Sequence, residues 1–386
     1  MASTPYSDPT VLASPHTEPQ PTEADLVVVF RGDGEPQTAR GLIRQLNAFA
    51  ETVGMVPDRF ARGGTVEQLE RRFAELLGKE AAVFMPTGTL ANHLAIRRLC
   101  GVKPRAVVQE QSHLYNDTGD CVPRLSGIHL VPLAPGRPAF TLDELQEVLQ
   151  RSVTGRVCSP VGAVMVESPV RRQHGQIMPY ADMVAITSYC QAQGIATHLD
   201  GARLYMMSAA TGISPQQYAS HFDTVYVSLY KYFGAPFGAI VAGTSACLDG
   251  LYHERRMFGG GLASASLAAA LALQGIEGFA TRFGAAMAKG ADLMNRLNKW
   301  QGIRVRRFAH GSNIFPVDLD PRVDLEIFLT ALRRSGIFLF PDEDNARQIH
   351  LTVNTTILRQ PNDTILAAFE QALGAAWKRS SPGAKP

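Results

Sequence analysis

The sequence is poor in the residues that mark disulfide-stabilised, zinc-binding or membrane-spanning proteins. Five of its 386 residues are cysteine, and these are widely scattered. No two of them have metal-ligand spacing, so we expect reduced thiols and predict no metal site. No run of eighteen apolar residues occurs either, so the sequence predicts no membrane span.

An excess of charge of one sign is also lacking. The chain has 37 Lys and Arg residues against 35 Asp and Glu residues, a formal net charge of +2. We therefore expect no nucleic-acid partner and no anionic membrane surface as partner. Residues 1–25 are rich in Pro, Ser and Thr and lack the basic start and apolar stretch of a signal peptide. We interpret them as a disordered arm and expect a cytoplasmic protein.

Apolar sequence is abundant, and it alternates between helical and strand patterns. Residues 64–79 place apolar side chains at helical spacing; Thr65 with Gln68 predicts a capping box, and Gly78 predicts the helix end. Short apolar runs recur between such helices, at 81–85, 106–110, 127–133, 161–167, 195–200, 223–229 and 238–243. This alternation predicts an α/β fold, with a mostly parallel sheet covered by helices on both faces.

The last third of the chain has a different pattern. An Ala-rich helical region at 263–300 leads into short strands and helices from about Ile303. We predict an arm at 1–25, a large domain at 26–290 with an N-terminal segment at 26–60, and a small α+β domain at 291–386.

Polar residues follow several predicted strands: His113, Glu167, Asp200 and Lys231. Ligand-binding groups collect at the carboxyl ends of strands in such sheets, so Asp200 and Lys231 are expected to face one crevice. A lysine beside apolar surface loses part of its ammonium stability and becomes a nucleophile, as a Schiff base with an aldehyde requires. A carboxylate at a pyridine nitrogen keeps that ring protonated, which makes it an electron sink.

The turn Pro-Thr-Gly-Thr at residues 86–89 precedes a predicted helix. It offers backbone N–H groups and a hydroxyl to a phosphate. An aldehyde, a ring nitrogen and a phosphate are the three groups by which a protein holds pyridoxal 5'-phosphate. We therefore predict this cofactor, attached to Lys231.

Four motifs resemble the threonine aldolase and β-eliminating lyase family of fold type I pyridoxal-phosphate enzymes. They are TVEQLERRFAELLGKEAAVFMPTGTLAN at 65–92, HLDGAR at 198–203, SLYKYFGAPFGAIVAG at 228–243 and RRMFGGGL at 255–262. The resemblance extends from roughly Arg31 onward. It implies a mostly parallel, seven-stranded type of sheet in the large domain, a small amino-acid substrate and a homodimer or homotetramer.

The resemblance also implies roles for single residues. Lys231 would carry the cofactor aldehyde, Asp200 would pair with the pyridine nitrogen, and Arg203 would lie near the phenolic oxygen. His113 would stack on the ring and assist proton transfer. The phosphate would contact Gly88, Thr89 and, as a third candidate, Ser228. For Glu167, support of His198, contact with the cofactor edge and a structural hydrogen bond all stay open.

The chain departs from the family pattern where the substrate is expected. Gly32 stands in place of a serine, Arg62 in place of a glutamate, and His350 in place of the late arginine that grips the substrate carboxylate. A histidine does not reproduce the bidentate fork of a guanidinium. The candidates for substrate binding are Arg62, Arg203, Arg347 and His350. The sequence thus predicts an intact cofactor site beside a rebuilt substrate site.

The predicted reaction is cleavage of a β-hydroxy amino acid to glycine and an aldehyde by a pyridoxal-phosphate-dependent carbon–carbon lyase, as in threonine aldolases. His113, or a water that it holds, is the candidate base. One alternative is β-elimination, or another amino-acid conversion with an altered carboxylate site. The other is a catalytically weak regulatory protein that binds the cofactor.

Overall fold

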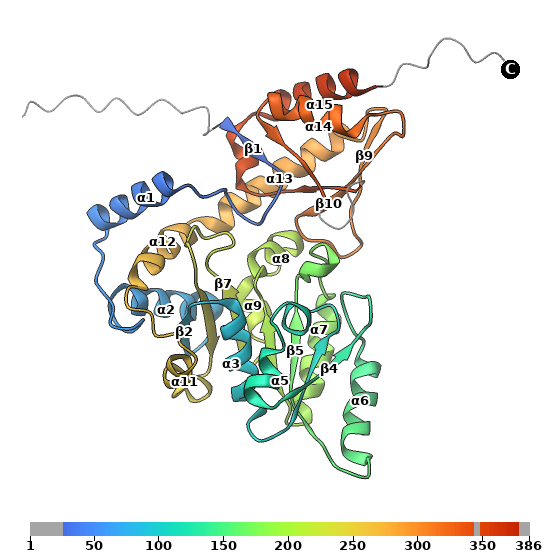
Figure 1. Cartoon of the computed structure of the whole chain (residues 1–386). Coiled ribbons are helices and arrows are strands. Elements are labelled where there is room, and N and C mark those ends of the chain that lie inside the picture. Colours follow the sequence, from blue (N-terminus) through green and yellow to red (C-terminus); the bar gives the residue numbers. More distant parts are fainter. Residues whose placement is uncertain (1–25, 343–347, 378–386) are drawn as a thin grey trace, which may run out of the picture.

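A computed structural model describes residues 26–342 and 348–377 of the chain. The predicted arm at 1–25 and the substrate candidate Arg347 lie outside these residues. The described part comprises a large domain with a central sheet and a smaller domain formed mainly by the C-terminal third (Figure 1).

The central sheet has seven strands in the order β2-β8-β7-β6-β5-β3-β4. Six strands are parallel, and β8 runs antiparallel to its neighbours β2 and β7. The strands are β2 (Ala81–Met85), β3 (Arg105–Gln109), β4 (His129–Leu133), β5 (Val161–Glu167), β6 (Ala196–Asp200), β7 (Thr224–Ser228) and β8 (Ala239–Gly243). The predicted α/β class and mostly parallel seven-stranded sheet are confirmed.

Burial on both faces explains why these strands are continuous apolar runs. In β5, Val164 and Val166 belong to one hydrophobic cluster, whereas Ala163 and Met165 belong to another. Alternate side chains of a strand point to opposite faces, so each face of the sheet has its own helical cover.

The helices of the large domain lie on both faces of the sheet or border it. Helices α2, α6 and α7 contribute to the first cluster, and α3, α4 and α5 contribute to the cover of the opposite face. Their bounds are α1 (Ala39–Thr52), α2 (Gly64–Leu77), α3 (Gly88–Cys100), α4 (His113–Asn116), α5 (Cys121–Ser126), α6 (Leu142–Thr154), α7 (Tyr180–Ala192), α8 (Leu204–Thr211), α9 (Pro215–Ala219), α10 (Ser245–Leu248), α11 (Leu251–Met257) and α12 (Ser266–Ile276), with the 3₁₀ helix η2 (Arg171–Gln173).

Helix α2 begins differently from the sequence prediction. Its N-cap is Gly63, which makes no side-chain capping bond, so the predicted capping box at Thr65 and Gln68 is wrong. The Thr65 hydroxyl instead accepts the Val56 N–H at 2.9 Å, which ties the preceding loop to the helix. The predicted helix end is confirmed, because Gly78 caps α2 in the left-handed conformation at φ 61°.

The small domain has its own core, and helix α13 (Phe279–Leu297) contributes side chains to both cores. Its remaining elements are β9 (Ile303–Val305), β10 (Ile314–Leu319), α14 (Leu325–Arg334), β11 (Ile337–Phe338), β12 (Phe340–Pro341), β13 (Ile349–Thr352), η3 (Thr355–Arg359) and α15 (Asn362–Ala376). Strand β1 (Val28–Val29) pairs in parallel with β11, so the first described residues lie beside this domain before the chain enters the large one (Figure 1). The domain boundaries given above stay a prediction.

All five cysteines are free thiols, and three of them are buried. Within residues 26–342 and 348–377, none of the helices combines the length and apolar character needed to cross a membrane.

Candidate cofactor and active site

A cavity of about 360 Å³ lies at the carboxyl ends of strands β5, β6 and β7. It brings together six residues that the sequence singles out as catalytic or cofactor-binding: Gly88, Thr89, His113, Asp200, Arg203 and Lys231. Glu167, Arg171, Tyr226 and Tyr230 also line it. In the parallel pairing of β5 with β6, Glu167 lies opposite Asp200, which puts both carboxyl groups at the same sheet edge.

Asp200 ends β6 and is held at both carboxylate oxygens. Oδ2 accepts the side-chain N–H of Asn92 at 2.6 Å, and Oδ1 accepts the backbone N–H of Ala202 at 3.1 Å. The residue is 2 % exposed. A buried carboxylate that receives hydrogen bonds keeps a fixed orientation, as a group aimed at a ring nitrogen needs.

The hydrogen bonds continue behind Asn92 to a buried histidine. Since the Asn92 amide donates to Asp200, its Oδ1 accepts from Nε2 of His198 at 2.9 Å. The His198 Nδ1 then accepts from the Thr224 hydroxyl at 2.8 Å. Burial lowers the pKa of His198 to about 4, so this histidine is neutral at pH 7. The chain from Thr224 to Asp200 therefore carries its negative charge at the cavity end only.

Lys231 lies three residues after β7 and is partly buried in the cavity wall. Burial lowers the pKa of its ammonium group to about 8, and the nearby Arg203 guanidinium adds to this effect. At pH 7 about a tenth of such a lysine is neutral, against about 0.03 % at the ordinary pKa. The site thus supplies a nucleophilic amine under neutral conditions.

Arg203 is engaged by the N-terminal segment. Its Nε lies 2.7 Å from Oδ1 of Asp33, and both side chains are largely buried. Gly34 allows this approach, because a Cβ at that position would lie 2.6 Å from the Lys231 carbonyl oxygen. The Arg-Gly-Asp-Gly stretch at 31–34 therefore forms part of the lysine's surroundings, a role that the sequence analysis missed.

The part of the cavity beside the start of α3 is suited to an anion. Thr87 caps α3 by accepting the Leu90 N–H at 3.2 Å, and the N–H groups of Gly88 and Thr89 belong to the first helical turn, which has no acceptors within the helix. A Cβ at Gly88 would lie 2.1 Å from the Tyr226 hydroxyl oxygen, so this position needs glycine. The buried Ser228 hydroxyl finds no hydrogen-bond partner within the described part of the chain.

His113 begins the short helix α4, and Glu167 fixes it in place. The Glu167 carboxyl group accepts the His113 backbone N–H at 2.5 Å and the Arg171 backbone N–H at 2.9 Å. Burial, with the nearby Asp200 charge, raises the pKa of Glu167 to about 7. Burial lowers the pKa of His113, and Asp200 opposes this shift. Of the roles left open for Glu167, the structure shows backbone hydrogen bonds that shape the cavity wall.

Two substrate candidates do not line this cavity. Arg62 packs over the Tyr252 ring at 4.3 Å, and His350 lies on β13 of the small domain beside Asp342. Arg171 lines the cavity instead, with its side chain 54 % exposed. The sequence signal was available, since Arg171 follows the end of β5 by four residues, in the run Glu-Ser-Pro-Val-Arg that begins with the last residue of that strand.

The residues present fit pyridoxal phosphate at each of its three groups. A partly buried amine, a hydrogen-bonded carboxylate and a helix N-terminus line one cavity. Ser228, the third phosphate candidate, is not among the residues that line it. The fold is that of the fold type I pyridoxal-phosphate enzymes, the class to which this site also corresponds.

Comparison with known proteins identifies the family within that class. The β-eliminating lyase family profile matches residues 46–319, so the chain belongs to this family and is a pyridoxal-phosphate-dependent lyase.

Several of the relatives carry the name threonine aldolase. Low-specificity L-threonine aldolase 1 of Arabidopsis thaliana is 26 % identical, over 80 % of this chain and 87 % of that enzyme. The low-specificity L-threonine aldolase of Candida albicans is 29 % identical, over 64 % of this chain and 66 % of its own length. The crystal structure of a candidate L-allo-threonine aldolase from Listeria monocytogenes matches with a TM-score of 0.73 and 27 % identity, over 90 % of this chain and 95 % of that one.

Proposed function

We propose that this protein cleaves the Cα–Cβ bond of a β-hydroxy-α-amino acid, releasing glycine and an aldehyde. The convergence of Lys231, Asp200 and His113 on one cavity carries the proposal. The names of its relatives support it, since they are aldolases of this type.

Pyridoxal phosphate, when bound, supplies an aldehyde that captures amino groups and a protonated ring that withdraws electrons. Lys231 provides the amine for attachment, and its lowered pKa keeps part of it neutral. Asp200, oriented by Asn92, would hold the proton on the ring nitrogen. Gly88 and Thr89 would bind the phosphate through their N–H groups.

His113 is the proposed base for the substrate β-hydroxyl. It lines the cavity, and its lowered pKa leaves the imidazole neutral and able to accept a proton near pH 7. The hydrogen bond from its backbone to Glu167 sets where α4 begins, and so positions the imidazole relative to Asp200.

Arg171 is the proposed partner of the substrate carboxylate. Arg203 is committed to Asp33, whereas Arg171 lines the cavity and its guanidinium lies 4.0 Å from Asp117, a loose ion pair. Loss of a charge-assisted hydrogen bond costs about 1.5–3 kcal/mol, so Arg171→Gln should raise KM roughly 10- to 150-fold. Arg172→Gln is the matched control, because its neighbouring guanidinium pairs with Asp117 at 3.0 Å and does not line the cavity. Equal KM values in the two variants would contradict the assignment.

A product assay tests the reaction itself. The full chain with pyridoxal phosphate is supplied with L-threonine, L-allo-threonine and phenylserine, and glycine and aldehyde are measured together. Release of both in equal amounts supports the proposal. Ammonia and a keto acid formed from serine or cysteine, without aldehyde, would favour β-elimination. A shift in cofactor absorbance with amino acids but no product would favour the regulatory role.

We also infer a cytoplasmic homodimer or homotetramer. Helix α1 supports self-association, since Phe49 is its sole buried residue while Ile43 is 61 % exposed. Light scattering of the full chain, compared with an Ile43→Glu variant, tests the assembly. A monomeric parent protein would refute this inference.

A further inference from the structure

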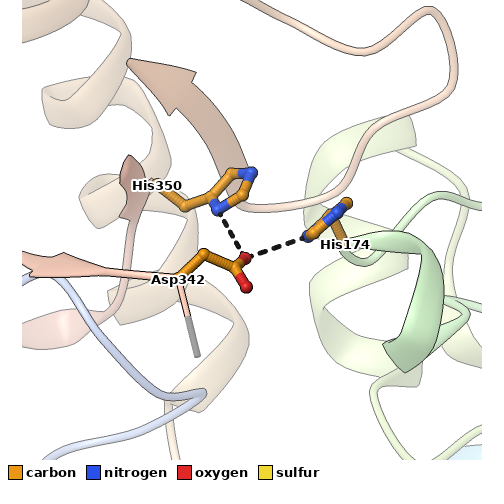
Figure 2. A group of neighbouring side chains, drawn as sticks. All are labelled: His174, Asp342 and His350. Carbon is orange, nitrogen blue, oxygen red and sulfur yellow. Dashed lines mark ion pairs between the residues drawn. The ribbon is translucent and has the colours of Figure 1, made fainter. Parts of the chain in front are cut away.

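Three potential metal ligands meet at the boundary between the two domains. His174 follows η2 of the large domain, whereas Asp342 and His350 belong to the β12–β13 region of the small domain (Figure 2). The ligand atoms of all three residues lie within 4.8 Å of one another. This cluster takes no part in the cavity described above.

The distances fit coordination around one ion. The Asp342 Oδ2 lies 3.2 Å from Nδ1 of His350 and 3.6 Å from Nδ1 of His174. Bonds of about 2.0–2.2 Å to a tetrahedral ion place neighbouring ligand atoms about 3.3–3.6 Å apart. A direct hydrogen bond explains only the distance of 3.2 Å between Asp342 and His350. The distance of 3.6 Å between Asp342 and His174 exceeds hydrogen-bonding range.

The His174 ring packs against two other rings. It stacks on Phe308 at 6.0 Å with an interplanar angle of 2° and on His350 at 4.5 Å. Its backbone is in the left-handed region at φ 52°, and Gly175 follows in the same region. A Cβ at Gly175 would lie 2.5 Å from the Ser312 hydroxyl oxygen of the small domain. This strained, tightly packed turn costs free energy, and such strain concentrates at functional sites.

The electrostatics disfavour a simple ion-pair network. Two protonated imidazoles stacked at 4.5 Å would repel each other. A neutral imidazole has the lone pair that a metal ion needs. The buried Nε2 of His350 also lacks a hydrogen-bond partner in residues 26–342 and 348–377, so the ring is not held by a complete network.

We propose that His174, Asp342 and His350 bind one divalent transition-metal ion of the Zn²⁺ or Co²⁺ class that bridges the two domains. Two nitrogens and one carboxylate oxygen suit such ions, and three protein ligands leave a position for water or another ligand. Access is open, because the His174 side chain is 38 % exposed while Asp342 and His350 are 15 % and 9 % exposed.

The ion would hold the segment that enters the active site. His174 lies three residues beyond Arg171, so a metal bond to the small domain restrains the η2 segment. This consequence rests on the function proposed above, whereas metal binding itself does not. Metal binding and amino-acid cleavage are therefore measured separately.

A cobalt titration tests the site. Full-length protein loaded with pyridoxal phosphate, free of any polyhistidine tag and dialysed against a chelator, is titrated with Co²⁺ while the visible d–d absorbance is recorded. The variants are His174→Gln, Asp342→Asn and His350→Gln. His129→Gln is the matched control, since His129 is an exposed histidine on β4. Unfolding temperatures with and without Zn²⁺ provide a second readout and show whether each variant folds.

We expect one Co²⁺ per chain, a dissociation constant at least about tenfold weaker in each site variant, and no change in His129→Gln. Zn²⁺ should raise the unfolding temperature of the parent and of the control but not of the site variants. Affinity and thermal shift that persist in His174→Gln and His350→Gln would overturn the proposal, as would the absence of a d–d band in the parent.

Discussion

Replacing Asn92 by leucine tests the idea that a hydrogen-bond chain orients the carboxylate of the cofactor site. Asn92 is fully buried and connects Asp200 with the neutral His198. Leucine keeps a similar volume but supplies neither the donor for Asp200 nor the acceptor for His198. The substitution thus separates the position of Asp200 from its identity.

The structure sets the size of two effects. Asp200 loses one of its two donors, a charge-assisted bond worth about 1.5–3 kcal/mol, so cofactor affinity should fall roughly 10- to 150-fold. The Nε2–H of His198 is left unpaired in the core, which costs about 1–3 kcal/mol of the free energy of unfolding. A second change, His198→Leu, removes that unpaired donor. Stability should then recover in part, while cofactor affinity should not.

The assay is a titration of the cofactor-free protein with pyridoxal phosphate, followed by absorbance, alongside urea unfolding. His93→Leu is the matched control, because His93 is the next residue on α3, is 2 % exposed and bonds the Ser126 hydroxyl at 2.7 Å. It should lose stability without losing cofactor affinity beyond about twofold. If Asn92→Leu binds the cofactor no more weakly than His93→Leu, Asn92 has a packing role only.

Three further predictions concern the same cavity. Lys231→Ala should abolish both activity and the visible absorbance of the attached cofactor; a borohydride-stable attachment to another lysine would contradict this. Asp200→Asn should retain part of the cofactor but slow turnover by orders of magnitude, since an amide does not hold the ring nitrogen protonated; near-native turnover would make Asp200 a turn residue only. The cofactor-free protein should take up pyridoxal phosphate faster as the pH rises through about 8, because the pKa of Lys231 is lowered and the neutral amine reacts. Stopped-flow absorbance checks this, and a rate that still climbs steeply toward pH 10 would refute it.

The fold was predictable because short stretches of sequence show which strands are buried on both faces and the order in which strands and helices alternate. Runs such as 161–167 lie between two helical layers, so both faces must be apolar and the pattern is unambiguous. Parallel strands also end at a common edge, which is why Asp200 and Lys231 could be expected in one cavity. Local spacing failed at Thr65, whose hydroxyl bonds the distant Val56 rather than its own helix.

Contacts between remote segments could not be derived from the sequence. Asn92 reads as an ordinary helical residue, and its role appears only once α3 lies against β6. Asp33 reaches Arg203 across 170 positions of the chain. Neither pair produces a repeating pattern in the sequence. The separation of Asp33 and Arg203 depends on how the N-terminal segment crosses from the small domain to the large one.

The candidate partners of the substrate carboxylate differ in the contacts that they already make. Arg203 would leave a buried carboxylate unpaired if it turned to a substrate, at a cost of several kcal/mol, so it is better suited to hold Asp33 beside Lys231. His350 is directed to Asp342 and His174 instead of the cavity. Breaking the ion pair between the exposed Arg171 and Asp117 costs little free energy, because that pair is loose and screened by solvent. The departures from the family pattern therefore fit one arrangement. Arg171, the proposed partner of the substrate carboxylate, lies on η2. His350, at the position of the expected arginine, belongs to the cluster proposed to hold η2 against the small domain.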